Sequence, residues 1–138
     1  MSACLAGINC RYDGGNSTSS KICEMIRRGK ALPVCPEQLG GLPTPRVPSE
    51  IRGGDGKDVL AGSAGVFNFA GENVTAEYIR GAFEALNIAH LVSAEKAVLK
   101  EKSPACGCRI ISRGGIRVSG MGVCAAVFVN AGIIIEPA

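Results

Sequence analysis

The chain has 138 residues, of which 46% are apolar, and this length and composition predict a single domain, 1–138, that buries its own core. Its net charge of +3 comes from 15 basic and 12 acidic side chains that are spread out without runs, so the charge pattern excludes the usual nucleic-acid-binding surfaces. The first residues lack the order of a signal peptide and no apolar run is long enough to span a bilayer, so we expect a cytoplasmic protein without membrane contact.

Apolar runs and turn residues predict the elements along the chain. In order, we expect a strand at 1–5, a helix at 17–28, a strand at 31–35, a long functional loop at 36–65, an edge strand at 64–69, a helix at 75–91, a strand at 97–99, a hairpin with arms at 110–111 and 116–118, a helix at 122–130 and a strand at 133–135. Strand, helix and strand joined by short turns favour parallel pairing. The expected fold class is therefore α/β, a three-layer sandwich around a short, mostly parallel sheet of the Rossmann or flavodoxin kind.

Three of the seven cysteines lie at or just past the end of an expected strand, namely Cys4, Cys35 and Cys106. Because loops at the carboxyl ends of parallel strands meet at one edge of a sheet, we expect these thiols to converge there. A cytosolic protein keeps its thiols reduced, so metal ligation or catalysis is a better explanation than a disulfide scaffold. Thiolates select zinc or iron-sulfur clusters, and three protein ligands leave one position open for a substrate.

The sequence leaves alternatives to this site. Cys4 and Cys35 could instead be small buried hydrophobic residues, which is common for cysteine in strands. A closed structural site needs a fourth ligand, for which Cys10 and Cys108 are the credible thiols.

The remaining metal-binding residue types are expected to be structural. The single histidine, His90, falls within the long expected helix and reads as a helix-face residue. Cys23 and Cys124 lie on apolar helix faces and are interpreted as packing residues.

Two further residues could move protons or activate a substrate beside these thiols. Glu37 follows Cys35 by two residues, where a carboxylate could act as acid or base, although capping of the turn or simple solvation is the more common role. Ser103 precedes a proline near Cys106 and could donate to a substrate or attack it, although a turn serine is a common alternative.

Charged residues in the loops at the same edge complete the expected site. Arg46 could bind an anionic or carbonyl group, and we take Arg46 and Asp13 as candidates for substrate binding. Alternatively, Arg11 and Asp13 pair with each other and hold a loop closed.

Motifs along nearly the whole chain resemble those of the bacterial domain-of-unknown-function family 523. The motifs are Ser2-Ala3-Cys4-Leu5 with Gly7, Arg11-Tyr12-Asp13-Gly14, the stretch from Cys35-Pro36-Glu37 to Pro45-Arg46, Gly53-Gly54-Asp55-Gly56, and the stretch from Lys100 to Cys106-Gly107.

The resemblance implies a thiouracil desulfidase, because this family includes enzymes in which three cysteines hold a 4Fe-4S cluster whose fourth iron has no protein ligand. The implied cluster ligands are Cys4, Cys35 and Cys106, with Glu37 as catalytic acid or base and Ser103 as the group that activates the substrate. The implied reaction is non-redox: iron acts as a Lewis acid on the sulfur of a thiolated base or nucleoside, water attacks the carbon, and uracil and sulfide leave.

Two other classes of function remain open at this point. One is a metal- or cluster-binding accessory module, such as a sulfur carrier, which would not need Glu37 and Ser103 beside the thiols. The other is a thiol-disulfide protein that uses Cys106 with Cys108 or Cys10, which would require a thiol of low pKa. The oligomeric state is not predicted.

Overall fold

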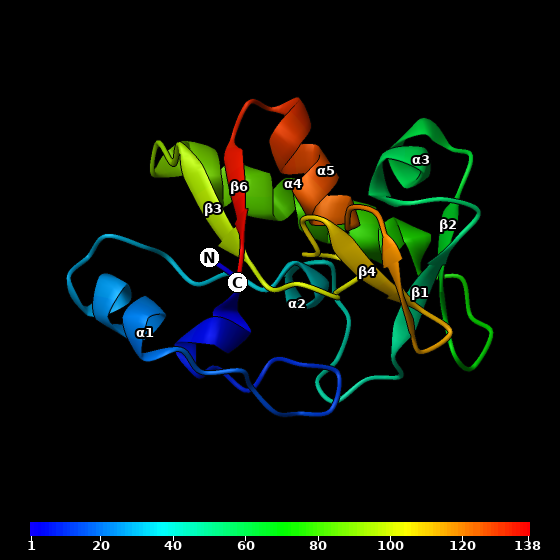
Figure 1. Ribbon diagram of the computed structural model, residues 1–138, viewed down its shortest axis with the longest axis horizontal. Helices are drawn as coiled ribbons and strands as arrows, with labels where there is room; N and C mark the ends of the chain where they lie inside the picture. The colour runs from blue at the N-terminus through cyan, green and yellow to red at the C-terminus, as the bar shows by residue number, and fades with distance from the viewer.

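Short strands and helices alternate along the chain, and the protein is a small mixed α/β structure (Figure 1). A computed structural model describes residues 1–138. Its elements are η1 (Ala3–Ala6, a 3-10 helix), α1 (Ser20–Arg27), α2 (Pro36–Leu39), β1 (Ser49–Arg52), α3 (Gly56–Ala61), β2 (Gly65–Asn68), α4 (Thr75–Leu91), β3 (Lys96–Leu99), β4 (Ile110–Arg113), β5 (Ile116–Ser119), α5 (Val123–Asn130) and β6 (Ile134–Pro137). None of the helices combines the length and apolar character needed to cross a membrane.

The strands pair in three small sheets. β3 and β6 are parallel, whereas β1 pairs with β2 and β4 with β5 in antiparallel ladders. The β4–β5 hairpin turns at Gly114 and Gly115, which both have positive φ, as a tight hairpin turn requires. The parallel pair and the hairpin are confirmed predictions.

Backbone hydrogen bonds add two more segments beside β3. The N–H of Ser2 donates to the carbonyl of Val98 at 3.0 Å, and Ser2 forms a parallel bridge with Val34. The N–H of Ala3 donates to the Val34 carbonyl at 2.8 Å. These contacts bring the segments before Cys4, before Cys35 and before Lys100 side by side, so the loops that follow them leave the same edge.

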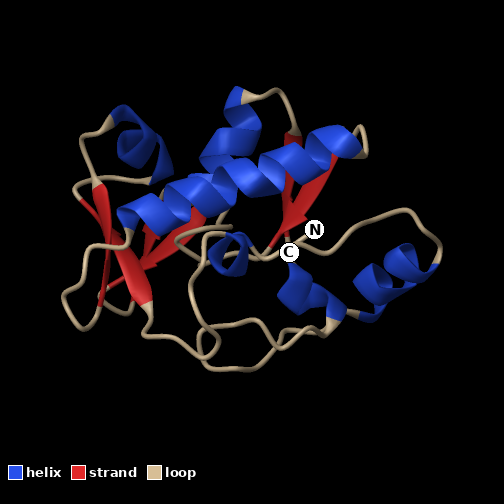
Figure 2. Ribbon diagram, turned by 180° about the vertical axis from the view of Figure 1, so that it is seen from behind, coloured by secondary structure: helices blue, strands red, loops and turns tan.

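The long helix α4 lies across the back of the molecule and connects its two halves (Figure 2). Its buried face is made of small residues together with Tyr78, and α5 packs against it in the largest hydrophobic cluster. On another side α4 meets α2, where Gly40 and Gly81 let the two backbones touch. A Cβ on Gly81 would lie 1.8 Å from the Pro36 carbonyl oxygen, so only glycine fits this crossing.

Two expected strands near the N-terminus are much shorter than predicted. In 1–5 only Ser2 forms a bridge, and the chain turns at once into η1, which ends at Gly7 with φ +84°. In 31–35 only Val34 is paired. The helix expected at 17–28 begins at Ser20; before it, the N–H groups of Ser17 and Ser19 donate to the carbonyls of Cys4 and Leu5, and Ser19 is still extended.

The stretch 36–65 is not the structureless loop that its prolines and glycines predicted. Pro36 stands at the first position of α2, where its missing N–H costs nothing. Asp55 and Asp58 form a capping box that starts α3. β1 forms because β2 supplies its partner, and the arm expected at 64–69 is confirmed as β2.

Candidate active site

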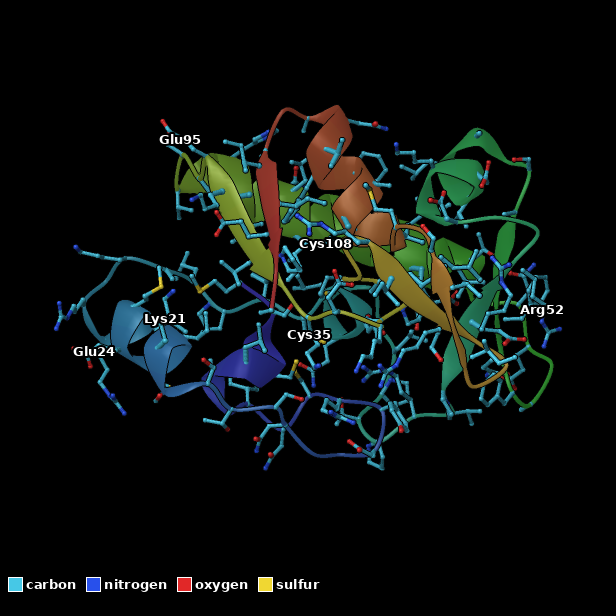
Figure 3. The ribbon with its side chains drawn as sticks, viewed as in Figure 1. Lys21, Glu24, Cys35, Arg52, Glu95 and Cys108 are labelled. Carbon is cyan, nitrogen blue, oxygen red and sulfur yellow. The ribbon has the colours of Figure 1, made fainter.

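A cavity of about 540 Å³ opens where the loops after Ser2, Val34 and β3 come together. Cys4, Cys35 and Cys106 all line it, so the expected convergence of these thiols is confirmed. Figure 3 places Cys35 near the middle of the molecule, whereas Lys21 and Glu24 lie towards one end and Arg52 lies at the other. This volume is within the range of ordinary small-molecule sites.

The cavity has a buried and an exposed part. We call the part lined by Cys4, Cys35, Cys106, Glu37 and Ser103 the floor. We call the part lined by Arg11, Tyr12 and Phe69 the mouth, because Tyr12 and Phe69 are exposed large side chains.

Backbone hydrogen bonds fix the position of each floor cysteine. Cys4 lies in η1, and its carbonyl accepts the N–H of Ser17 at 2.9 Å. Cys35 ends an extended segment and caps α2, with the N–H of Leu39 donating to its carbonyl at 3.0 Å. Cys106 lies in a turn held against the start of α5, where Cys124 donates its N–H to the Ala105 carbonyl at 2.9 Å.

Burial and neighbouring thiols raise the pKa of Cys4 and of Cys106 and so disfavour negative charge on them. Burial raises the pKa of Cys4, and the neighbouring Cys35 raises it further. Burial also raises the pKa of Cys106 well above its ordinary value, with Cys124 the next cause. Crowded thiols of this kind stay protonated alone and become thiolates when a cationic metal centre compensates their charge.

Glu37 is held at both carboxylate oxygens. The guanidinium of Arg46 forms an ion pair with one oxygen, and the hydroxyl of Tyr78 donates to the other at 3.1 Å. The side chains of Glu37 and Arg46 are only 12% and 6% exposed. Arg46 also donates to the Cys10 carbonyl at 3.0 Å, so its guanidinium positions Glu37 and the adjoining loop.

Ser103 forms a turn, as the alternative interpretation predicted. Its hydroxyl proton is not used by the hydrogen bonds of this turn. Its hydroxyl oxygen accepts the N–H groups of Ala105 and Cys106, each at 3.1 Å. Because both of these bonds use the oxygen as acceptor, the single hydroxyl proton remains available for donation into the cavity.

Arg11 and Asp13 pair with each other, as one of the two alternatives predicted. Arg11 donates to Asp13 at 3.2 Å, and the Asp13 carboxylate also accepts the N–H of Gly15 at 2.9 Å. Arg11 lines the cavity, whereas Asp13 is not among its lining residues. The structure therefore places Asp13 behind Arg11, and its contact with a substrate stays a prediction.

A family model described as 2-thiouracil desulfurase matches residues 1–136. The chain belongs to this family. Among curated proteins, it is 45% identical over 135 residues to the uncharacterised protein YbbK of Bacillus subtilis (strain 168), covering 96% of this chain and 89% of YbbK. Among solved structures, it is similar to that of the 4Fe-4S-dependent thiouracil desulfidase TudS, with a TM-score of 0.86 and 38% identity, covering 99% of this chain and 87% of that one.

The other cysteines occupy different surroundings in this family member. Cys10 is buried and lines the same cavity, and burial, followed by the proximity of Cys35, raises its pKa to about 12. Cys108 and Cys124 belong to the main hydrophobic cluster, and Cys23 lies on α1; none of these three lines the cavity. His90 is exposed on α4, as expected for a helix-face residue.

The thiol-disulfide alternative is disfavoured by the same burial. A redox-active pair needs a thiolate of low pKa, and burial instead raises the pKa of Cys108 to about 11 and that of Cys10 to about 12.

Tyr78 was missed as a functional residue. Tyr78 falls within the helix expected at 75–91 and is buried on α4. A tyrosine on a buried helix face nevertheless needs a hydrogen-bond partner for its hydroxyl, and this requirement was the available signal. The partner, Glu37, lies 41 residues away, so local sequence could not identify it.

Proposed function

We propose that this protein is an iron-sulfur-dependent desulfidase that converts thiouracil, as a base or nucleoside, to uracil and sulfide without net redox change. The observation that carries the proposal is the shared cavity of Cys4, Cys35 and Cys106, with Glu37 and Ser103 beside them. Family membership and the likeness to a desulfidase that depends on a 4Fe-4S cluster support this reaction class.

The three floor thiols suit a polynuclear cluster better than a single ion. Thiolates on one tetrahedral zinc ion stand about 3.8 Å apart, because each Zn–S bond is about 2.3 Å. No group of three or more His, Cys, Asp or Glu side chains is gathered closely enough to hold a single metal ion. Iron-sulfur clusters are held by cysteine thiolates, and Cys4, Cys35 and Cys106 would supply this type of ligand from three segments that line one cavity.

Cys4, Cys35 and Cys106 would hold such a cluster and leave one iron without a protein ligand. When bound, the cluster supplies Lewis acidity towards the sulfur of the substrate. Iron-sulfur centres favour thiolate ligands, and the buried, crowded thiols described above supply them once the charge is compensated.

Glu37 and Ser103 supply the proton chemistry of the floor. An ionised Glu37 can only accept hydrogen bonds, so its carboxylate can orient a water molecule and take its proton as the oxygen bonds to the thiocarbonyl carbon. As the C–S bond breaks, Glu37 can return that proton to the departing sulfur, and loss of the second water proton to solvent completes the carbonyl of uracil, so that thiouracil and water give uracil, hydrosulfide and a proton. Ser103 would donate its free hydroxyl proton to a polar atom of the ring.

The remaining parts of the proposal concern the setting of the site. We propose that the short parallel pairing around β3 is the centre of a three-layer arrangement, with α4 and α5 on one side. We also propose a cytosolic location, where reduced thiols and small thiolated bases or nucleosides are available.

The decisive test is anaerobic reconstitution with iron and sulfide, followed by measurement of iron content and of sulfide release from 2- and 4-thiouracil. The wild type and Cys23→Ser should bind a cluster and release sulfide, whereas Cys35→Ser should do neither. Cys23 is a matched control because it is half-buried on α1 and outside the cavity. A cluster without turnover would favour the accessory module, and the absence of any cluster would overturn both functions.

A further inference from the structure

Aromatic side chains are scarce in this protein and concentrated at the cavity. The chain contains two tyrosines, four phenylalanines and no tryptophan. Both tyrosines and one phenylalanine line the cavity, namely Tyr12, Tyr78 and Phe69. Tyr78 is buried and its hydroxyl is committed to Glu37, whereas Tyr12 and Phe69 are 45% and 56% exposed.

The exposed ring of Phe69 stands on a well-ordered turn after β2. The buried side chain of Asn68 accepts the N–H groups of Ala70 and Glu72 at 3.0 and 2.9 Å, and it donates to the Glu72 carboxylate at 2.8 Å. The N–H of Phe69 donates to the Pro48 carbonyl at 3.0 Å. These bonds fix the backbone on both sides of Phe69, so the ring is presented to the cavity from a rigid support.

Exposure alone does not distinguish Phe69, because single exposed hydrophobic residues are ordinary. Phe83 on α4 is 48% exposed and does not line the cavity. Phe69 differs in its place at the mouth and in the turn built around it. Tyr12 lines the same cavity from the loop after η1, and the two segments come from different parts of the fold (Figure 1).

We propose that Phe69, together with Tyr12, forms an aromatic entrance that stacks on the flat ring of the incoming thiolated pyrimidine and so sets the affinity for substrate. Every pyrimidine presents a π-face, and stacking of this face on an aromatic side chain strengthens binding. The inference rests on the proposed function. Both rings are exposed at the mouth, whereas the thiols lie at the floor. The entrance therefore affects substrate binding and leaves the rate of C–S bond cleavage unchanged.

The experiment compares reconstituted wild type with Phe69→Ala, Phe69→Tyr and the control Phe83→Ala. We expect Phe69→Ala to raise KM for 4-thiouracil about tenfold, which corresponds to about 1.4 kcal/mol, with unchanged kcat and thermal stability. Phe69→Tyr, which keeps a ring, and Phe83→Ala should retain the wild-type KM. An unchanged KM in Phe69→Ala, or an equal rise in Phe83→Ala, would overturn the inference.

A second measurement separates this inference from the proposed function. Calorimetric titration of the same reconstituted proteins with uracil reports binding without turnover, and Phe69→Ala should weaken it by the same factor as KM. If the wild type released no sulfide, the proposed function would fail, and the uracil titration would still decide for or against the entrance.

Discussion

At the floor of the cavity, Cys4 and Cys106 are buried and Glu37 is nearly so, whereas at the mouth Tyr12 and Phe69 expose about half of their surface. The floor is positioned by contacts between distant segments, such as the α2–α4 crossing and the turn against α5. The mouth combines local turns, built around Asn68 and Asp13, with one long-range backbone bond on each segment, from the N–H of Phe69 to the Pro48 carbonyl and from the N–H of Arg46 to the Tyr12 carbonyl. Substitutions at the floor should therefore affect cluster binding, folding and turnover, and those at the mouth should affect substrate affinity.

The largest expected effect is at Cys106. Cys106→Ser should abolish cluster binding, measured as iron and sulfide per protein after reconstitution, because it removes a proposed ligand from the floor. Cys108→Ser is the matched control, since Cys108 is equally buried two residues away but does not line the cavity. Figure 3 shows Cys108 set apart from Cys35. Loss of the cluster in Cys108→Ser, or its retention in Cys106→Ser, would contradict the proposal that Cys106 is a cluster ligand.

The next effect is on stability, at the helix crossing that supports the floor. Gly81→Ala should lower the free energy of unfolding by about 3 kcal/mol, because the new methyl group overlaps the Pro36 carbonyl and pushes α2 away from α4. Chemical denaturation of the protein measures this change. Asn87→Ala, on an exposed position of the same helix, should change it by less than about 0.5 kcal/mol. Equal free energies of unfolding for the two variants would show that α2 and α4 are not in tight contact at Gly81.

Glu37 tests whether the floor performs proton transfer. Glu37→Gln should lower kcat for sulfide release about 100-fold, equivalent to about 2.7 kcal/mol, because the amide cannot take a proton from water. Iron content should stay at the wild-type value, since Glu37 is not a proposed ligand. Glu84→Gln on the exposed face of α4 serves as the control. An unchanged kcat in Glu37→Gln would favour the accessory module.

The sequence predicted the residues of the floor better than the helices and strands in which they lie. Cys4, Cys35 and Cys106 were brought together correctly, because each follows an apolar segment whose carboxyl end leaves the same edge. The strands expected before Cys4 and Cys35 are nevertheless single bridges, since η1 and α2 begin immediately afterwards. Propensity detects an apolar run, but the length of a strand depends on its neighbours.

The partners of the floor residues were harder to predict than the residues themselves. The pairing of Arg11 with Asp13 follows from their spacing, whereas the contacts of Glu37 with Tyr78 and of Gly81 with Pro36 depend on the packing of α4 against α2. The region 36–65 was misassigned for a similar reason, because β1 is stable only when β2 pairs with it.

The smallest expected effect is at Asp13, which tests its predicted contact with a substrate. The N–H of Gly15, followed by Arg11, lowers the pKa of this exposed carboxylate. A lowered pKa contributes stability that is fully present above the ordinary carboxyl range and is lost as pH falls through the folded-state value, so Asp13→Asn should unfold slightly earlier than wild type at about pH 7, with a smaller difference at about pH 3. Because Asp13 lies behind Arg11, KM for 4-thiouracil should change by less than about twofold. A larger rise in KM with an unchanged melting temperature at both pH values would mean that Asp13 touches the substrate, and the mouth would then have to include it.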